Sequence, residues 1–559
     1  GVDPGALYLY RLDGDLERPD PASRHQPRGI HGPSCIIDSR FEWSDGGWTG
    51  LDLRNYILYE LHVGTFSPEG AFEGVIRYLD DLAELGVTAL ELMPVAQFPG
   101  RRNWGYDGVY PFAVQDSYGG PGALKRLVDA CHRRAIAVVL DVVYNHLGPE
   151  GNYLADFAPY FADTYRTPWG AALNFDGPWS DEVRRYFIEN ALTWIRDYHI
   201  DALRLDAVHG IFDQSARPFR EELAEAVHGE SRTTGRPLHL IAESNLNDPR
   251  FARPVEEGGL GLDALWNDGF HHALHALLTG EREAYYVDFG RFDQMRKSLR
   301  EGFVFTGDYS VYRRRRYGRS SRALPTEGLV VYVQNHDQVG NRAHGDRLST
   351  LVGFEALKLA AGAVLLSPYT PLLFMGEEWG ETAPFPYFID HSDPDLVDAT
   401  RRGRLEEFTH LKQERRIPDP ADESTFSSAR LNWTARGSGQ HATTLNVYRE
   451  LMRLRKELAA RECLGRTSLA VAGYEEQRIL FVRYWSASCD AAAVFHFGHQ
   501  PASIDLPFPA GRWSKRFDSA GADWGGPGSG LPAHFVSEGG IRLVVAAESF
   551  CLYDRMKGG

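Results

Sequence analysis

The chain has 559 residues, 43% of them hydrophobic, which is enough for a large core with one or two smaller domains. Its formal net charge is −16 and its basic residues are scattered, so nucleic acid is excluded as a natural partner and a neutral ligand is favoured. The most apolar stretch, residues 359–366, is too short to cross a bilayer, and no signal sequence opens the chain, so we predict no membrane association and a cytoplasmic protein.

The first fifty residues contain one strand-like run, at residues 6–12, and then a stretch rich in Pro and Gly. This is too little sequence for an independent β-domain. We interpret residues 1–50 as a truncated N-terminal β-segment, the remnant of a β-sandwich with its linker.

From Tyr56 onward, apolar strand-like runs alternate with helical segments, which is typical of parallel β/α units. The predicted helices include residues 71–85, residues 121–134 and a helix that begins at Ser180. Eight strands are predicted, at residues 57–63, 89–95, 137–143, 202–208, 238–242, 262–266, 329–334 and 371–375. Eight strands close a barrel, so the α/β domain at residues 51–462 is predicted to be a (β/α)8 TIM barrel with insertions.

After a last long helix at residues 443–460, three short apolar runs are separated by Gly and Pro clusters. These runs, at residues 478–484, 491–497 and 542–547, predict a C-terminal antiparallel β-sandwich over residues 463–559. The five cysteines are widely spaced and form no CxxC pair, so we expect neither a disulfide framework nor a zinc site, and a reducing compartment fits. We expect no metal and no cofactor.

Three predicted strands lead into a carboxylic acid, namely Asp206, Glu243 and Asp337. The carboxyl ends of barrel strands build the active site, and three acids there suit cleavage of a glycoside. Arg204 shares a strand face with Asp206 and would keep it ionised, as a nucleophile requires. A plain structural ion pair is the competing interpretation of Arg204 and Asp206 when they are taken alone.

Glu243 follows apolar residues and has no basic neighbour in the sequence, so burial is expected to raise its pKa and make it the proton donor. Asp337 is expected to bind substrate hydroxyls, together with His336 and His146. Direct attack by the nucleophile would retain the anomeric configuration and needs the two carboxyl groups about 5 to 5.5 Å apart. Asp141 is expected to be structural and to pair with the arginine of the neighbouring strand.

Residues 141–146, 202–209, 241–243 and 334–337 resemble, in the right order, the four signature regions of the α-amylase superfamily. The resemblance implies a (β/α)8 barrel and a retaining mechanism on α-glucosidic bonds. Longer segments resemble the maltooligosyltrehalose trehalohydrolase family of that superfamily; these are residues 59–70, 103–108, 145–153, 242–249 and 372–379. This closer resemblance implies hydrolysis of the α-1,4 bond beside the terminal trehalose of a maltooligosyltrehalose, in a pathway with a maltooligosyltrehalose-forming synthase.

The same resemblance implies roles for four more residues. Tyr106 would stack beneath the sugar at the cleavage site, Asp107 and His146 would bind its hydroxyls, and His209 would face the leaving trehalose. The chain departs from the family in its short N-terminal β-segment and at residues 268–269, where Asp-Gly stands in place of two acids.

Two other functions stay open at this point. A transferase of the same superfamily, such as a glycogen branching enzyme, would use the same carboxylates and differ in its acceptor site. A non-catalytic sugar-binding barrel would normally have lost one of them.

Three further groups of residues receive structural interpretations. The histidines at positions 271, 272 and 275 are interpreted as packing rather than metal ligands. The basic run at residues 313–316 is interpreted as a solvated loop. Trp169, Phe175 and Trp179 suit either a glucan path or ordinary packing.

Overall fold

Eight parallel strands form a closed barrel in the structure, a computed structural model that describes residues 2–409 and 416–556. The barrel strands are β5 (Leu58–Leu61), β6 (Ala89–Leu92), β9 (Ala137–Val142), β12 (Ala202–Leu205), β13 (His239–Ala242), β14 (Ala264–Trp266), β17 (Leu329–Val331) and β18 (Thr370–Phe374). They follow one another around the barrel in chain order, and β18 pairs with β5 to close it. The predicted TIM barrel is confirmed, with each strand at its expected place.

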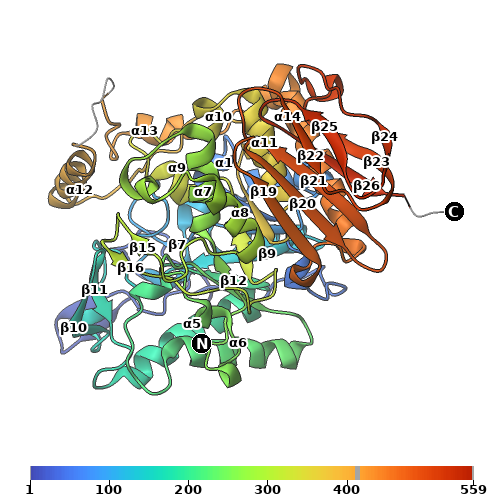
Figure 1. Ribbon diagram of the computed structural model, residues 1–559. Coiled ribbons are helices and arrows are strands. Elements are labelled where there is room, and N and C mark those ends of the chain that lie inside the picture. The colour runs from blue at the N-terminus through green and yellow to red at the C-terminus, as the bar shows by residue number, and fades with distance from the viewer. Residues whose placement is uncertain (1, 410–415, 557–559) are drawn as a thin grey trace.

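Helices surround the barrel (Figure 1). The longer ones are α4 (Gly120–His132), α5 (Ser180–Tyr198), α6 (Phe219–Thr234), α7 (Asp268–Thr279), α8 (Phe292–Glu301), α11 (Phe354–Leu365), α12 (Pro394–Glu407) and α14 (Gly439–Ala460). The single helix expected over residues 71–85 is divided into α2 (Phe72–Ile76) and α3 (Leu79–Leu85), because the backbone of Tyr78 between them leaves the helical conformation. The Tyr78 ring stacks on Trp433 with ring centroids 3.7 Å apart. Within the described residues, no helix is both long and apolar enough to cross a membrane.

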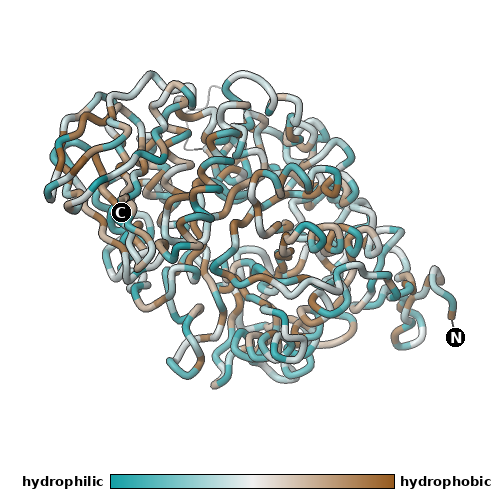
Figure 2. Tube along the Cα trace, turned by 90° about the vertical axis from the view of Figure 1, so that its right-hand side faces the viewer, coloured by the Kyte–Doolittle hydropathy of each residue, from teal (hydrophilic) through white to brown (hydrophobic). Residues whose placement is uncertain are grey.

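The hydrophobic core runs through the barrel strands and the inner faces of the helices, and Figure 2 shows hydrophobic segments in the interior. A separate cluster fills the amino end of the barrel, where alanines from four strands leave room for larger rings. Ala89, Ala137, Ala202 and Ala264 are these small residues, each at most 1% exposed. Close packing of this kind holds the strand ends, and the acids that follow them, in fixed positions.

The C-terminal residues form the predicted β-sandwich, drawn in orange and red in Figure 1. Its larger sheet has the order β19 (Leu469–Tyr474), β20 (Ile479–Trp485), β21 (Asp490–His496), β26 (Ser549–Arg555), β23 (Gly511–Asp518) and β24 (His534–Ser537). The smaller sheet pairs β22 (Ala502–Leu506) with β25 (Ile541–Val545). Apolar side chains from both sheets form one buried cluster between them.

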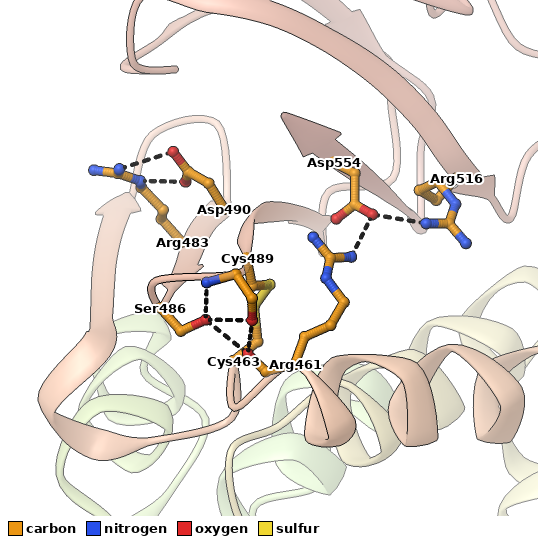
Figure 3. Close-up of a disulfide and its surroundings, with 9 residues drawn as sticks. Arg461, Cys463, Arg483, Ser486, Cys489, Asp490, Arg516 and Asp554 are labelled. Carbon is orange, nitrogen blue, oxygen red and sulfur yellow. Dashed lines mark hydrogen bonds and ion pairs between the residues drawn. A yellow bond between two sulfur atoms is a disulfide. The ribbon is translucent and has the colours of Figure 1, made fainter. Parts of the chain in front are cut away.

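A disulfide joins Cys463 to Cys489, with Cα atoms 5.9 Å apart (Figure 3). The expectation of no disulfide is therefore wrong. Cys463 follows α14, and Cys489 lies in the turn between β20 and β21, which returns the chain to the end of that helix. Spacing alone gave no sign of this contact because the tertiary packing of helix against hairpin creates it. The cysteines consequently lend no support to a reducing compartment.

Residues 2–50 lie against the barrel rather than apart from it. They form two short pairs, β1 (Leu7–Tyr8) with β4 (Ser34–Cys35) and β2 (Tyr10–Leu12) with β3 (Leu16–Arg18). Further along, Ser44 donates to Asp129 of α4, and the Asp45 carboxylate contacts His132 and His199 at 2.8 and 2.7 Å. These contacts attach the N-terminal segment to the outer side of the barrel at its amino end.

Asp201, at the amino end of β12, is buried and lies at the centre of these contacts. Its carboxylate accepts hydrogen bonds from Trp48 Nε1 (2.7 Å), His132 Nε2 (2.9 Å) and the Val138 backbone (2.8 Å). Asp201→Asn would turn an amide toward these donors, so we expect the free energy of unfolding to fall by about 2 to 4 kcal/mol. Urea denaturation measures this loss. An unchanged unfolding midpoint would contradict the assignment.

Candidate active site

The carboxyl ends of the barrel strands open into a cavity of about 730 Å³, and the three predicted acids all line it. Asp206 directly follows β12 and Glu243 directly follows β13. Asp337 lies in the first turn of α9 (His336–Gly340), whose Asn335 cap accepts from the Gln338 backbone at 2.8 Å. The side chains of Asp206 and Glu243 are 13% exposed and that of Asp337 is 38% exposed, so the first two are the more shielded from water.

Asp206 is held in one orientation from two sides. Arg204 Nη1 donates to its Oδ1 at 2.8 Å, and Asn145 Nδ2 donates to its Oδ2 at 2.7 Å. Burial works against the charged form, yet the Arg204 charge and the Asn145 hydrogen bond hold the pKa of Asp206 below its ordinary value. The carboxylate is thus ionised at neutral pH with its direction fixed.

Glu243 has the opposite electrostatic character. Burial raises its pKa to about 8, and the charges of Asp206 and Asp337 act in the same direction. Its Oε2 accepts a hydrogen bond from the Ala207 backbone at 2.6 Å and lies 3.9 Å from Arg204 Nη2. A basic neighbour is therefore present, contrary to the sequence expectation, but burial outweighs it.

Arg204 and Asp141 lie beneath the cavity floor and do not line it. Arg204 Nη1 donates to both oxygens of Asp141, at 3.1 and 3.0 Å, as the sequence predicted for neighbouring strands. Tyr106 Oη donates to Asp141 Oδ2 at 2.6 Å, so the tyrosine on the cavity wall is tied to the same network. Arg204 itself is fully buried, with its guanidinium 4.3 Å from the centroid of the Trp266 ring.

The other predicted binding residues divide into lining and supporting groups. Tyr106, Asp107, His146 and His209 line the cavity, whereas His336 is 1% exposed and lies behind Tyr106. Burial lowers the pKa of both His146 and His209, so these two rings are neutral at pH 7.

Some cavity residues escaped the sequence reasoning, either because they come from an inserted hairpin without a motif or because they lie in or beside recognised segments but carry no expected role. The hairpin of β15 (Tyr309–Ser310) and β16 (Arg315–Arg316) carries Arg313 to the cavity, where its Nη2 donates to the Asn245 carbonyl at 2.9 Å. The solvated-loop interpretation is wrong for Arg313, while its three arginine neighbours are exposed. The sequence feature that could have pointed to Arg313 as a cavity residue was the pair of tyrosines that flank the basic run. The remaining unpredicted lining residues include Asn247, Asp268, His272, Tyr285, Tyr312, Tyr317, Gln338 and Arg404.

The three aromatic residues of the long loop lie in three different environments. Trp169, between β10 (Phe161–Thr167) and β11 (Gly170–Leu173), lines the cavity, and its ring stacks on the ring of His146. Trp169 is 45% exposed. Phe175 is 1% exposed and packs on Phe219, and Trp179 is 80% exposed away from the cavity. Of these three aromatic residues, Trp169 is therefore the one that can offer its ring face to a ligand at this site.

The histidines of α7 lie on two sides of that helix. His271 contacts the Val333 carbonyl and Tyr286, and His275 contacts Glu281 at 2.9 Å, as packing residues do. His272 packs against Tyr285 and Phe289, with ring centroids 4.5 and 4.9 Å apart, and also lines the cavity. Within residues 2–409 and 416–556, no group of three or more His, Cys, Asp or Glu side chains is arranged to hold a metal ion.

Comparison with known proteins finds chains that are closely similar in sequence and in structure. The family model for the alpha-amylase catalytic domain matches residues 35–167. A malto-oligosyltrehalose trehalohydrolase of Saccharolobus solfataricus is 49% identical over 82% of this chain and 78% of that protein, and one of Arthrobacter ramosus is 50% identical over 81% and 79%. A Salmonella typhimurium crystal structure described as an alpha amylase matches with a TM-score of 0.88 at 38% identity, covering 100% of this chain and 91% of that one.

The closed barrel, the C-terminal sandwich and the cavity with three acids define a glycoside hydrolase of the α-amylase type. Sequence identity of 49 and 50% to two relatives, over about four fifths of this chain, identifies the family within this class. The chain belongs to the malto-oligosyltrehalose trehalohydrolase family.

Proposed function

We propose that this chain hydrolyses the α-1,4-glucosidic bond next to the terminal trehalose of a maltooligosyltrehalose and releases trehalose and a maltooligosaccharide. The observation that carries the chemistry is the pair Asp206 and Glu243, whose pKa values are shifted in opposite directions within one cavity. The choice of substrate is supported by the family to which the chain belongs.

In the first step, Asp206 attacks the anomeric carbon while Glu243 gives its proton to the leaving oxygen. The Asp206 carboxylate can act as a nucleophile because Arg204 keeps it ionised and Asn145 fixes its direction. The acid is ready because burial keeps Glu243 protonated near neutral pH. A glucosyl ester of Asp206 forms, and the trehalose part leaves.

In the second step, Glu243 is ionised and acts as a base. It takes a proton from water, the water oxygen attacks the anomeric carbon, and the bond to Asp206 breaks. Two inversions at one carbon retain its configuration. Asp337 stabilises the sugar in both steps by accepting hydrogen bonds from its hydroxyls, which strengthen as positive charge develops on the ring.

Substrate binding falls to residues around these three acids. Tyr106 forms the platform under the sugar, Asp107 and His146 bind its hydroxyls, and His209 faces the leaving trehalose. Arg204 and His336 act from beneath the cavity floor. We further propose that the substrate is supplied by a maltooligosyltrehalose-forming synthase in the cytoplasm.

The pH dependence of kcat/KM tests the two acid–base assignments. Glu243 must be protonated, so activity is expected to fall as pH rises through about 8, the value to which burial raises its pKa. Asp206 must be ionised, and its pKa lies below its ordinary value, so the acid limb is expected below about pH 4. Circular dichroism over the same range controls for unfolding. An alkaline limb near pH 5 would contradict the assignment of Glu243.

The substrate is tested by incubating the enzyme separately with a maltooligosyltrehalose and with the maltooligosaccharide of equal length. Rapid release of trehalose from the first, with little change in the second, is the expected result. Cleavage or lengthening of the plain maltooligosaccharide would favour an α-glucan transferase such as a branching enzyme. No turnover of either would favour a sugar-binding barrel.

A further inference from the structure

Glu60 of β5 contacts the ring of His336 on the side away from the cavity; Glu60 lies in the recognised segment 59–70 but was given no role there. Glu60 Oε2 accepts from the His336 backbone N–H at 2.8 Å, and its Oε1 lies 2.5 Å from His336 Nδ1. Both side chains are 1% exposed, so water does not compete for these contacts. A carboxylate oxygen only accepts, and Nδ1 therefore carries a proton.

The opposite ring nitrogen also carries a proton. His336 Nε2 lies 2.7 Å from Tyr106 Oη, and that hydroxyl donates its only proton to Asp141 Oδ2. Arg204 Nη1 lies within hydrogen-bond distance of both oxygens of Asp141, which favours the carboxylate there, although burial raises the pKa of Asp141 to about 7. With Asp141 accepting from Tyr106, Tyr106 Oη accepts from Nε2, and this arrangement of donors fits an imidazolium.

The charges around His336 agree with this geometry. The groups that face it are Glu60, Glu91, Tyr106, Asp141, Arg204 and Asp337. Burial alone would lower its pKa, but Asp337 and Glu60 outweigh burial and Arg204, so the pKa of His336 rises to about 9. His62, packed on the other side, is neutral because burial lowers its pKa to about 4.

We propose that Glu60 is a positioning residue that keeps His336 in the imidazolium form and thereby fixes Tyr106 and Asp337 on the cavity wall. Nδ1 and the backbone N–H anchor the histidine to β5. Nε2 then donates to Tyr106 Oη and lies 3.4 Å from Asp337 Oδ1, so one charged ring orients both the sugar platform and the third acid. The role of the platform rests on the proposed function.

The test substitutes Glu60 by Gln and follows the ring of His336 by NMR titration of ¹³Cε1-labelled histidine, with the signal assigned from its loss in His336→Asn. Glu60→Gln removes the negative charge at almost constant volume. We expect the His336 midpoint to fall by at least about one pH unit. We also expect kcat to fall roughly tenfold, because the platform and Asp337 lose their fixed positions. Glu60→Asp keeps the charge but moves it away from Nδ1, so this variant is expected to recover only about half of the shift.

Glu91 offers a matched control from the neighbouring strand. It is the register partner of Glu60 in β6, is 1% exposed, and its carboxyl oxygens have no hydrogen-bond partner within the described residues. Burial raises the pKa of Glu91 well above its ordinary value, which favours the neutral carboxyl, so Glu91→Gln is expected to remove less negative charge than Glu60→Gln does. The His336 midpoint is therefore expected to shift less in Glu91→Gln than in Glu60→Gln.

Two results would overturn the proposal. One is an unchanged His336 midpoint in Glu60→Gln, or in Glu60→Asp if the first variant does not fold, since the shorter side chain loses contact with Nδ1. The other is an equal shift in Glu91→Gln. The titration uses enzyme without substrate, so it is independent of whether trehalose is the product. Conversely, absence of trehalose release with a normal titration would count against the proposed function alone.

Discussion

Asp206→Asn is expected to lower kcat/KM by about 10⁴-fold or more, equivalent to about 5 kcal/mol of transition-state stabilisation. The amide cannot form the glucosyl ester, and it also loses the charge that Arg204 and Asn145 orient. Steady-state release of trehalose measures the loss, and thermal unfolding by circular dichroism shows whether the fold is kept. A variant that retains a tenth of the activity would end the assignment of Asp206 as nucleophile.

Asp201→Asn is the matched control for that experiment, because β12 carries one buried aspartate at each end. Asp206 lies at the carboxyl end in the cavity, whereas Asp201 receives its hydrogen bonds at the amino end from Trp48, His132 and Val138. The two variants are expected to separate catalysis from stability. Asp206→Asn loses turnover with little loss of stability, and Asp201→Asn loses stability with kcat close to that of the unsubstituted enzyme. Loss of both properties in both variants would show that the strand acts as one structural unit.

Glu243→Gln has the second largest expected effect, a fall of about 10³-fold in kcat/KM on the natural substrate. Gln cannot protonate the leaving oxygen, so the first step slows. An α-glucosyl fluoride needs no such proton, and with this substrate the ester on Asp206 is expected to form and then accumulate, since the base for the second step is also missing. Intact-protein mass spectrometry detects the added sugar. Equal losses on both substrates would contradict the assignment of Glu243 as proton donor.

Glu377→Gln is the control for the effect of losing a buried acid. Burial raises the pKa of Glu377 to about 8, as it does for Glu243, but Glu377 accepts from Tyr448 at 3.0 Å and does not line the cavity. Its substitution is expected to leave the ratio of activities on the two substrates unchanged. A changed ratio would mean that burial of an acid, rather than its place in the cavity, produces the selective effect.

Local sequence patterns predicted the structure reliably where the same simple chemistry repeats along the chain. Eight apolar runs with helical segments between them predicted the barrel, and Arg204 two residues before Asp206 predicted an ion pair on one strand face. Acids that directly follow buried strands must reach the same rim of a parallel barrel. For this reason Asp206 and Glu243 could be grouped from the sequence, together with Asp337, which follows β17 in the first turn of α9.

Contacts between distant segments could not be read in the same way. Arg313 reaches the cavity from an inserted hairpin, and Cys463 meets Cys489 because a β-hairpin returns to the end of a helix. Neither residue has a motif at a fixed spacing. Their positions follow from the packing of whole elements, which burial of apolar surface drives without leaving a local pattern.

The sequence by itself determined the type of barrel, the three acids and the family, since these depend on strand periodicity and on residues at strand ends. The sequence predicted the opposite pKa shifts of Asp206 and Glu243, but only the tertiary structure decided that Arg204 lies near both acids. Arg204 lies near both Asp206 and Glu243, yet one pKa falls and the other rises. At Asp206 the charge of Arg204 and the hydrogen bonds from Arg204 and Asn145 act together to outweigh burial, whereas at Glu243 burial outweighs the contact at 3.9 Å. Coulomb interaction and desolvation depend on three-dimensional distance and not on sequence spacing.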